Sequence, residues 1–240
     1  AYNLGVKELA VMLPPDDICK RKIAIFKARY PHSLFDSFWR YKQTVETGKS
    51  TILDDVHLGN TTTHLAGMLR DGAWKVARTG IPSDGKIKEI LERIAPHYKR
   101  IRHINIGGGS LASIRKELAS VYKGLTGISH TRWHDPDRFN NFYIMGKSKV
   151  LMFIWGQTPG FDERVREGFS PGTHAPAPYY LHPLCVEERR YKPEEFCDIL
   201  EELDNWVRAW PHSNGGKTFQ NLCPEWPIGR VIDVIYWVKD

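Results

Sequence analysis

The 240-residue chain has no apolar stretch that approaches the roughly 18–20 residues of a membrane span, and its N-terminus lacks the apolar segment of a signal peptide. Its four cysteines are scattered and form no Cys-x-x-Cys pair. This spacing argues against a zinc ribbon or an iron–sulfur cluster and fits a reducing compartment. We therefore expect no membrane association and an intracellular location, in the cytoplasm, the nucleoid or the nucleus.

Alternating strand patterns are scarce: the best candidates are the short segments 101–106 and 148–155. Most of the chain instead repeats apolar residues with the period of a helix. In residues 85–98, one stripe contains Ile87, Ile90, Leu91, Ile94 and Tyr98. Helices are predicted over residues 15–30, 33–45, 60–76 (beginning at the cap cluster Asn60-Thr61-Thr62), 85–98, 110–125 (capped by Ser110), 193–210 and 227–240.

We therefore predict a mainly α fold, a helical bundle with little or no sheet. The whole chain, residues 1–240, is expected to form a single helical domain. The sequence leaves open a division into two lobes with a cleft between them, an N-terminal part of residues 1–125 and a second part of residues 126–240. The Pro-rich segment 170–178 is then the expected seam.

A formal net charge of +6 makes the chain basic, which suits a polyanionic partner such as nucleic acid. Eight tryptophans and ten tyrosines are more than packing alone usually recruits. Aromatic rings of this kind can stack on bases, although most are expected in the core.

Two Gly-Lys-Ser triplets lack the glycine five positions earlier that a P-loop requires, because Gln43 and Asn141 occupy those positions. The glycine-rich segment 104–110 could form an anion cradle before a helix, or a simple connection capped by Ser110. The second interpretation is favoured, since no acidic ribose partner follows about 20 residues later.

His130 and His134 have the spacing of a metal-binding pair, but they lie in a predicted loop that also contains Pro136, where the two rings need not converge. His57 and His64 have no third ligand nearby. We predict no metal site and no cofactor.

The segment 145–169, MGKSKVLMFIWGQTPGFDERVREGF, carries the clearest functional pattern. Gly146, Lys147 and Ser148 are predicted to form a turn at the head of a helix, where exposed backbone N–H groups bind phosphate. Lys149 begins the buried run that ends at Trp155. Asp162 follows a Gly/Pro-rich break, either as a helix N-cap or as a carboxylate at the mouth of a cleft.

This arrangement resembles the helix-hairpin-helix DNA glycosylases over about 120 residues of the second half of the chain. Residues 146–151 resemble the hairpin and its second helix, and residues 159–162 resemble the turn that carries the family's essential aspartate. Residues 227–237 are similar to the closing helix of distant members. The chain differs in having Tyr-Ile-Met at 143–145 in place of Leu-Pro-Gly, and its lysine-to-aspartate interval is shorter.

The resemblance implies excision of a damaged or unusual base from double-stranded DNA, the first step of base excision repair, by a monomeric enzyme. Asp162 would stabilise the oxocarbenium-like transition state or orient water. Lys149, or less well Lys147, would attack C1′ if the enzyme is also a lyase. Gly146, Lys147 and Ser148 would contact DNA. The extruded base would need apolar or aromatic walls, for which the candidates are Trp155, Phe161, Trp133 and Trp39.

Three other functions remain open. A DNA-binding module without catalysis would use the hairpin alone. A nuclease would use the acidic residues of 15–17 and 84–86, although these lie on predicted helices or loops and lack a third acidic partner. A helical scaffold would bind another protein through its aromatic surface.

Overall fold

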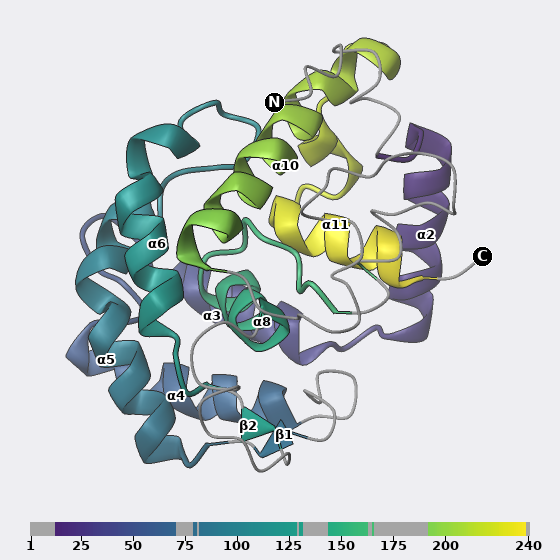
Figure 1. Cartoon of the computed structure of the whole chain (residues 1–240). Coiled ribbons are helices and arrows are strands. Elements are labelled where there is room, and N and C mark those ends of the chain that lie inside the picture. Colours follow the sequence, from purple (N-terminus) through teal and green to yellow (C-terminus); the bar gives the residue numbers. More distant parts are fainter. Residues whose placement is uncertain are drawn as a thin grey trace.

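The computed structural model describes residues 13–70, 79–80, 82–128, 130–131, 144–162, 165 and 192–238. Over these ranges the chain is mainly helical, which confirms the predicted fold class (Figure 1). The long helices are α2 (Asp16–Arg29), α3 (Leu34–Val45), α4 (Asp55–Arg70), α5 (Asp84–Ile101), α6 (Arg115–Gly124), α8 (Ile144–Ile154), α10 (Pro193–Ser213) and α11 (Ile228–Trp237). Two 3-10 turns, η1 (Leu111–Ile114) and η3 (Phe219–Leu222), and an antiparallel pair of two-residue strands, β1 (Thr79–Gly80) and β2 (His130–Thr131), complete the described structure.

Local capping explains where several helices begin. The Ser33 side chain accepts the backbone N–H of Asp36 at the start of α3, and Ser83 accepts that of Lys86 at the start of α5. Helix α10 begins with Pro193, whose missing N–H costs nothing at the first helical position. These three boundaries lie within one residue of those that the sequence predicts.

The predicted start of the third helix at Asn60 is wrong, because α4 already begins at Asp55. Thr61 and Thr62 are buried within the helix, and their hydroxyls donate to the carbonyls of Ile52 and Leu58. Threonines that find such acceptors are tolerated within a helix, so a cap-like cluster need not mark a helix start.

Neither of the two best strand candidates forms a strand, as the expectation of little or no sheet requires, and residues 149–154 lie in the helix expected after the Gly-Lys turn. Segment 101–106 comprises the last residue of α5 and the turns after it, and 148–155 belongs mostly to α8. All side chains from Val150 to Ile154 are buried, so this stretch has no polar face that could reveal a helical period. Ser110 makes no side-chain capping bond, which corrects the predicted cap of the fifth helix.

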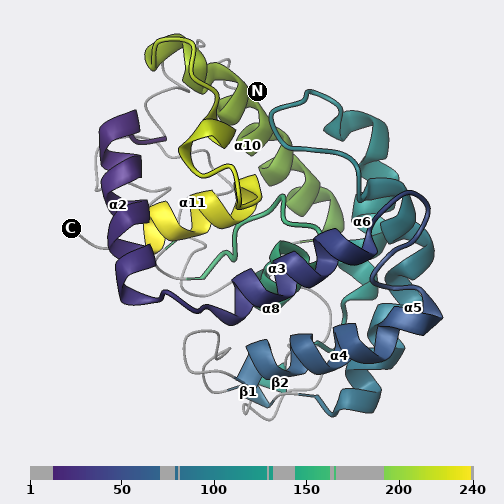
Figure 2. The ribbon, with the colours of Figure 1, turned by 180° about the vertical axis from the view of Figure 1, so that it is seen from behind.

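The buried helix α8 lies in the middle of the molecule. Helices α4, α5 and α6 lie on one side of it, and α2 and α11 lie on the other (Figures 1 and 2). The ring of Phe153 on α8 lies 5.5 Å from that of Phe35 on α3, and one hydrophobic cluster includes residues of all eight long helices. None of the described helices has both the length and the apolar composition needed to cross a membrane.

Candidate functional site

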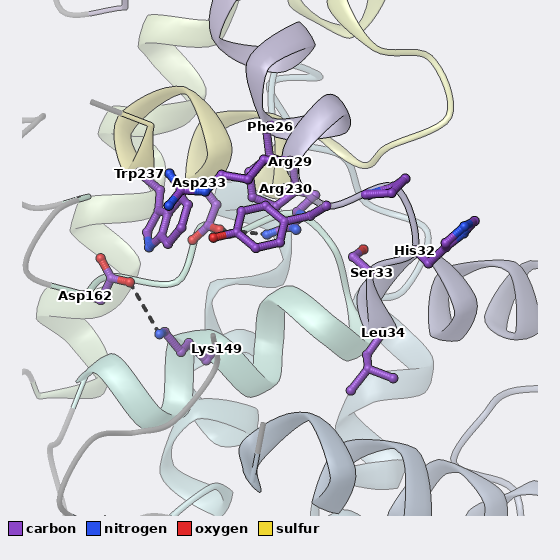
Figure 3. Close-up of a pocket in the computed structure, with 12 residues that line it drawn as sticks. Phe26, Arg29, His32, Ser33, Leu34, Lys149, Asp162, Arg230, Asp233 and Trp237 are labelled. Atoms are coloured by element: carbon purple, nitrogen blue, oxygen red, sulfur yellow. Dashed lines mark hydrogen bonds and ion pairs between the residues drawn. The ribbon is translucent and has the colours of Figure 1, made fainter. Parts of the chain in front are cut away.

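A pocket of about 320 Å³ opens between the connection of α2 to α3, helix α8 with the end of the turn after it, and α11 (Figure 3). Aromatic side chains, Phe26, Tyr30 and Trp237, form part of its wall. Exposed Arg29 and His32 lie at its mouth. Four charged side chains form its inner end, namely Lys149, Asp162, Arg230 and Asp233.

Lys149 and Asp162 point toward each other in this pocket and form an ion pair, with 3.3 Å between Nζ and Oδ2 (Figure 3). Their side chains are only 6% and 17% exposed. Lys149 projects from α8, and Asp162 ends the turn that follows this helix. The two residues that the sequence singles out, thirteen positions apart, therefore meet in one site.

The turn that carries Asp162 is held from two sides. The backbone N–H of Phe161 donates to Ser148 Oγ of α8 (2.9 Å), and that of Gly160 donates to Asp233 Oδ1 of α11 (3.1 Å). Gly160 also packs so closely on the Lys149 stem that an added Cβ would lie 2.8 Å from Lys149 Cγ. The turn is therefore seated against both helices.

Asp162 uses its two oxygens differently. Oδ1 accepts the backbone N–H of Val165 (3.1 Å), as a helix N-cap does, whereas Oδ2 faces Lys149. The cap and the pocket carboxylate, which were alternatives from the sequence, are thus combined in one side chain.

Arg230 and Asp233 form a second ion pair, 3.0 Å between Nη1 and Oδ2, and both are buried (Figure 3). The Arg230 guanidinium stacks on the rings of Phe26 and Phe35, 4.7 and 4.9 Å from their centroids. Burial raises the pKa of Asp233 to about 6, against the opposing effect of Arg230, and the nearby Asp162 carboxylate adds to the rise.

The sequence reasoning did not select Arg230 or Asp233 as site residues. A signal was present, because these are the two charged residues within the otherwise apolar run IGRVIDVIYW of α11. Ionised residues on a buried helix need a partner, and their spacing of three places them on the same face.

Gly146, Lys147 and Ser148 do not form the predicted exposed turn. They lie within the first turns of α8, and all three are buried. Lys147 Nζ lies 3.3 Å from Thr126 Oγ1 and 4.6 Å from the centroid of the Tyr122 ring, and burial lowers its pKa to about 7. As placed, this segment offers no surface on which a DNA phosphate could rest.

Two of the predicted base-contacting residues lie outside the pocket. Trp155 is buried, and its Nε1 donates to the carbonyls of Ile101 and Ile104. Phe161 is buried against the ring of Phe196. Trp133 lies outside the described residues. The aromatic residues of the pocket come instead from α2, its C-terminal connection and α11, which no local pattern around Lys149 could indicate.

The glycine-rich segment 104–110 does form a cradle of backbone N–H groups, but a carboxylate of the chain itself occupies it. Asp204 Oδ1 of α10 accepts the N–H of Gly107 (2.7 Å) and, at 3.4 Å, that of Gly109. Its other oxygen accepts Arg208 Nε at 2.9 Å. The segment is therefore structural.

Two of the three acidic residues considered for a nuclease form ion pairs. Asp16 pairs with Lys20 and Lys217, and Asp84 pairs with Arg70. Among the described residues, no group of three or more histidine, cysteine or acidic side chains could hold a metal ion.

Comparisons of the chain with models of known protein families, with curated proteins and with solved structures find no match. The resemblance to glycosylases rests on residues of segments 145–169 and 227–237. The function is therefore argued from the chemistry of the pocket.

Proposed function

We propose that this protein is a DNA glycosylase that removes a damaged or non-canonical base from double-stranded DNA. The observation that carries the proposal is the Lys149–Asp162 pair, 3.3 Å apart at the inner end of a pocket with aromatic walls. A carboxylate can stabilise the cationic transition state of N-glycosyl cleavage, and a lysine beside it can act as a nucleophile at C1′.

The bond to the base breaks through a transition state in which C1′ of the sugar becomes positively charged. A carboxylate held beside C1′ stabilises this charge, and Asp162 Oδ2 is the proposed group. In the hydrolytic form of the reaction, Asp162 also orients the water that adds to C1′ while the base departs with the bonding electrons.

Lys149 offers a second form of the same reaction. After losing a proton, its Nζ attacks C1′ and displaces the base, and opening of the sugar ring gives a Schiff base, which then permits strand cleavage. In the resting structure the Lys149 ammonium pairs with Asp162, so this carboxylate is the proposed acceptor of the proton.

The shape of the pocket supports a flipped base as its ligand. Its volume of about 320 Å³ lies at the lower end of the range for small-molecule sites, about 300–1,000 Å³. Phe26, Tyr30 and Trp237 offer ring surfaces, and a base inside a duplex must leave the stack to reach them.

The test is release of labelled bases from duplexes that each carry one lesion: uracil, hypoxanthine, 8-oxoguanine or an alkylated purine. Asp162→Asn removes the charge but keeps an oxygen that can cap Val165, so the fold should be retained. We expect it to slow base release by roughly 10²–10³-fold, the usual effect of losing one stabilising group. Asp198→Asn, at an exposed position of α10, is the matched control and should leave the rate unchanged.

Borohydride trapping on the same duplexes distinguishes the two forms. A covalent adduct that is lost in Lys149→Gln assigns Lys149 as the nucleophile, whereas base release without an adduct assigns the hydrolytic form. Equal base release by wild type and Asp162→Asn would overturn the proposal, as would the absence of release from every lesion.

A further inference from the structure

Helices α2 and α3 and the turn between them carry a net positive charge. Residues 16–45 contain seven lysines and arginines against three aspartates, a net charge of +4, whereas the whole chain has +6. The same segment contributes Phe26, Arg29, Tyr30 and His32 to the pocket of the proposed reaction. A basic segment of the chain therefore borders this pocket.

Several of these cations are already neutralised by neighbours. Lys20 pairs with Asp16, Lys27 with Glu225 and the buried Lys42 with Glu46. Arg29 and Arg40 differ: both are exposed, and neither has a carboxylate partner within the described ranges. An exposed guanidinium without a carboxylate partner is well suited to bind a phosphate.

The two arginines border two different pockets. Arg29 lines the pocket of Lys149 and Asp162, and Arg40 lines a second pocket of about 370 Å³ together with Trp39, Gln43 and Trp226. Tyr30 and Pro31 line both pockets, so the turn after α2 separates them. Trp39 is half-buried, and it therefore offers part of its surface to a ligand.

The location of the pocket constrains where DNA can lie. An extruded base enters from the duplex, so the mouth of the pocket must face the DNA. The buried residues 146–148 cannot supply the phosphate contacts at this mouth, whereas Arg29 and His32 are exposed there.

We infer that the α2–α3 corner, residues 27–43, is the DNA-binding surface of this protein. Arg29 binds a phosphate beside the extruded nucleotide. On the other side of the Tyr30–Pro31 turn, Arg40 binds a further phosphate, and the second pocket receives the adjacent nucleotide. This inference rests on the proposed DNA substrate, but it can be tested without any lesion.

The experiment measures binding to a lesion-free duplex by fluorescence anisotropy between 50 and 300 mM salt. Arg29→Gln, Arg40→Gln and the double variant are compared with Arg100→Gln, an arginine on α5 whose side chain is 70% exposed. Each phosphate contact contributes about 0.9 to the slope of log K against log salt. We expect each corner variant to reduce the slope by about 0.9, and the double variant by about twice that amount. Arg100→Gln should keep the wild-type slope.

Gln43→Glu tests the second pocket by adding a negative charge at an exposed position. It should weaken duplex binding and lower its sensitivity to salt, because an added negative charge opposes neutralisation of the phosphates. Unchanged slopes in all corner variants, an equal loss in Arg100→Gln, or no binding by the wild type would overturn the inference.

Base release is measured separately, so that the two proposals can fail independently. Reduced slopes without base release from any lesion would support DNA binding by the α2–α3 corner and contradict the proposed glycosylase activity. Base release that depends on Asp162, with slopes unchanged in the corner variants, would support the glycosylase and place its DNA elsewhere.

Discussion

Four charged side chains share the inner end of the pocket, where little water can reach them. Lys149 pairs with Asp162 and Arg230 pairs with Asp233, so the group as a whole is neutral. Burying an ion costs several kcal/mol of folding free energy, and the attraction of its partner only partly offsets this cost. A protein in which apolar residues of similar volume replace such a pair is often at least as stable. The presence of two such pairs in one pocket is therefore better explained by chemistry than by stability.

Lys147 is another side chain whose burial in its charged form costs folding free energy. It lies in the core between Thr126 and the Tyr122 ring, and burial lowers its pKa from 10.5 to about 7. The folded protein thus releases this proton at a lower pH than the unfolded chain. Between these two pKa values the unfolded chain binds more protons, so the contribution of Lys147 to the free energy of unfolding rises with pH.

We therefore expect Lys147→Met to be more stable than wild type at pH 6, by about 2–4 kcal/mol, given about 1.4 kcal/mol for each unit of pKa shift. The difference should shrink as the pH rises from 7 toward 10. Denaturant unfolding at pH 6, 7.5 and 9 measures it, with the exposed Lys123→Met as the control. A difference that stays constant across these pH values would contradict the assignment.

At the scale of elements, the site depends on how α8 and α11 hold the turn between Gly156 and Asp162. Ser148 of α8 binds the N–H of Phe161, and Asp233 of α11 binds that of Gly160. These contacts place Asp162 beside Lys149 although the turn itself has no regular secondary structure. The close approach of Gly160 to Lys149 leaves no room for a side chain.

Gly160→Ala should therefore displace the Lys149 stem, because the new Cβ would lie 2.8 Å from Lys149 Cγ and 3.2 Å from Asp233 Oδ1. We expect a loss of about 1–3 kcal/mol in the free energy of unfolding, the usual effect of overpacking, together with slower base release. Gly67→Ala in α4, where an added Cβ meets nothing within 4 Å, should instead stabilise by about 0.5–1 kcal/mol. Denaturant unfolding and base release are measured for both variants. Equal free energies of unfolding for Gly160→Ala and Gly67→Ala would refute the steric argument.

At the scale of the whole molecule, Asp204 joins parts of the chain that are far apart in sequence. From α10 it binds the N–H groups of Gly107 and Gly109 in the connection between α5 and α6. The side chain is only 5% exposed, and Arg208 binds its second oxygen. This contact ties α10 to the α5–α6 connection.

Asp204→Ala should leave these partly buried N–H groups without their acceptor and lower the free energy of unfolding by about 1–3 kcal/mol. Asp198→Ala on the same helix removes an exposed ion pair with Arg115 and should cost about 0–1 kcal/mol. Denaturant unfolding of the two variants side by side tests the difference. Similar losses would mean that the cradle contributes nothing beyond a surface contact.

Interactions close in sequence made several features predictable. The stripe of α5 is buried as expected, at Ile87, Ile90, Leu91, Ile94 and Tyr98, because a helix with one apolar and one polar face shows its period in the sequence. The predicted starts at residues 33, 85 and 193 lie within one residue of the observed ones, because the apolar period and, at Pro193, the preference of proline for the first turn are local signals. Lys149 and Asp162 could be selected because a glycine- and proline-rich break separates them from each other.

Contacts distant in sequence decided the rest. The apolar run of α8 has no polar face, so only its surroundings show that Gly146–Ser148 are buried within the helix and do not form an exposed turn before it. The pocket wall comes from α2 and α11, more than 80 positions away from Lys149 on either side. The sequence by itself thus determined the helical class and two of the four charged groups of the pocket, Lys149 and Asp162. The tertiary structure determined which groups meet, because packing between helices, and not propensity within them, sets the distances across the pocket.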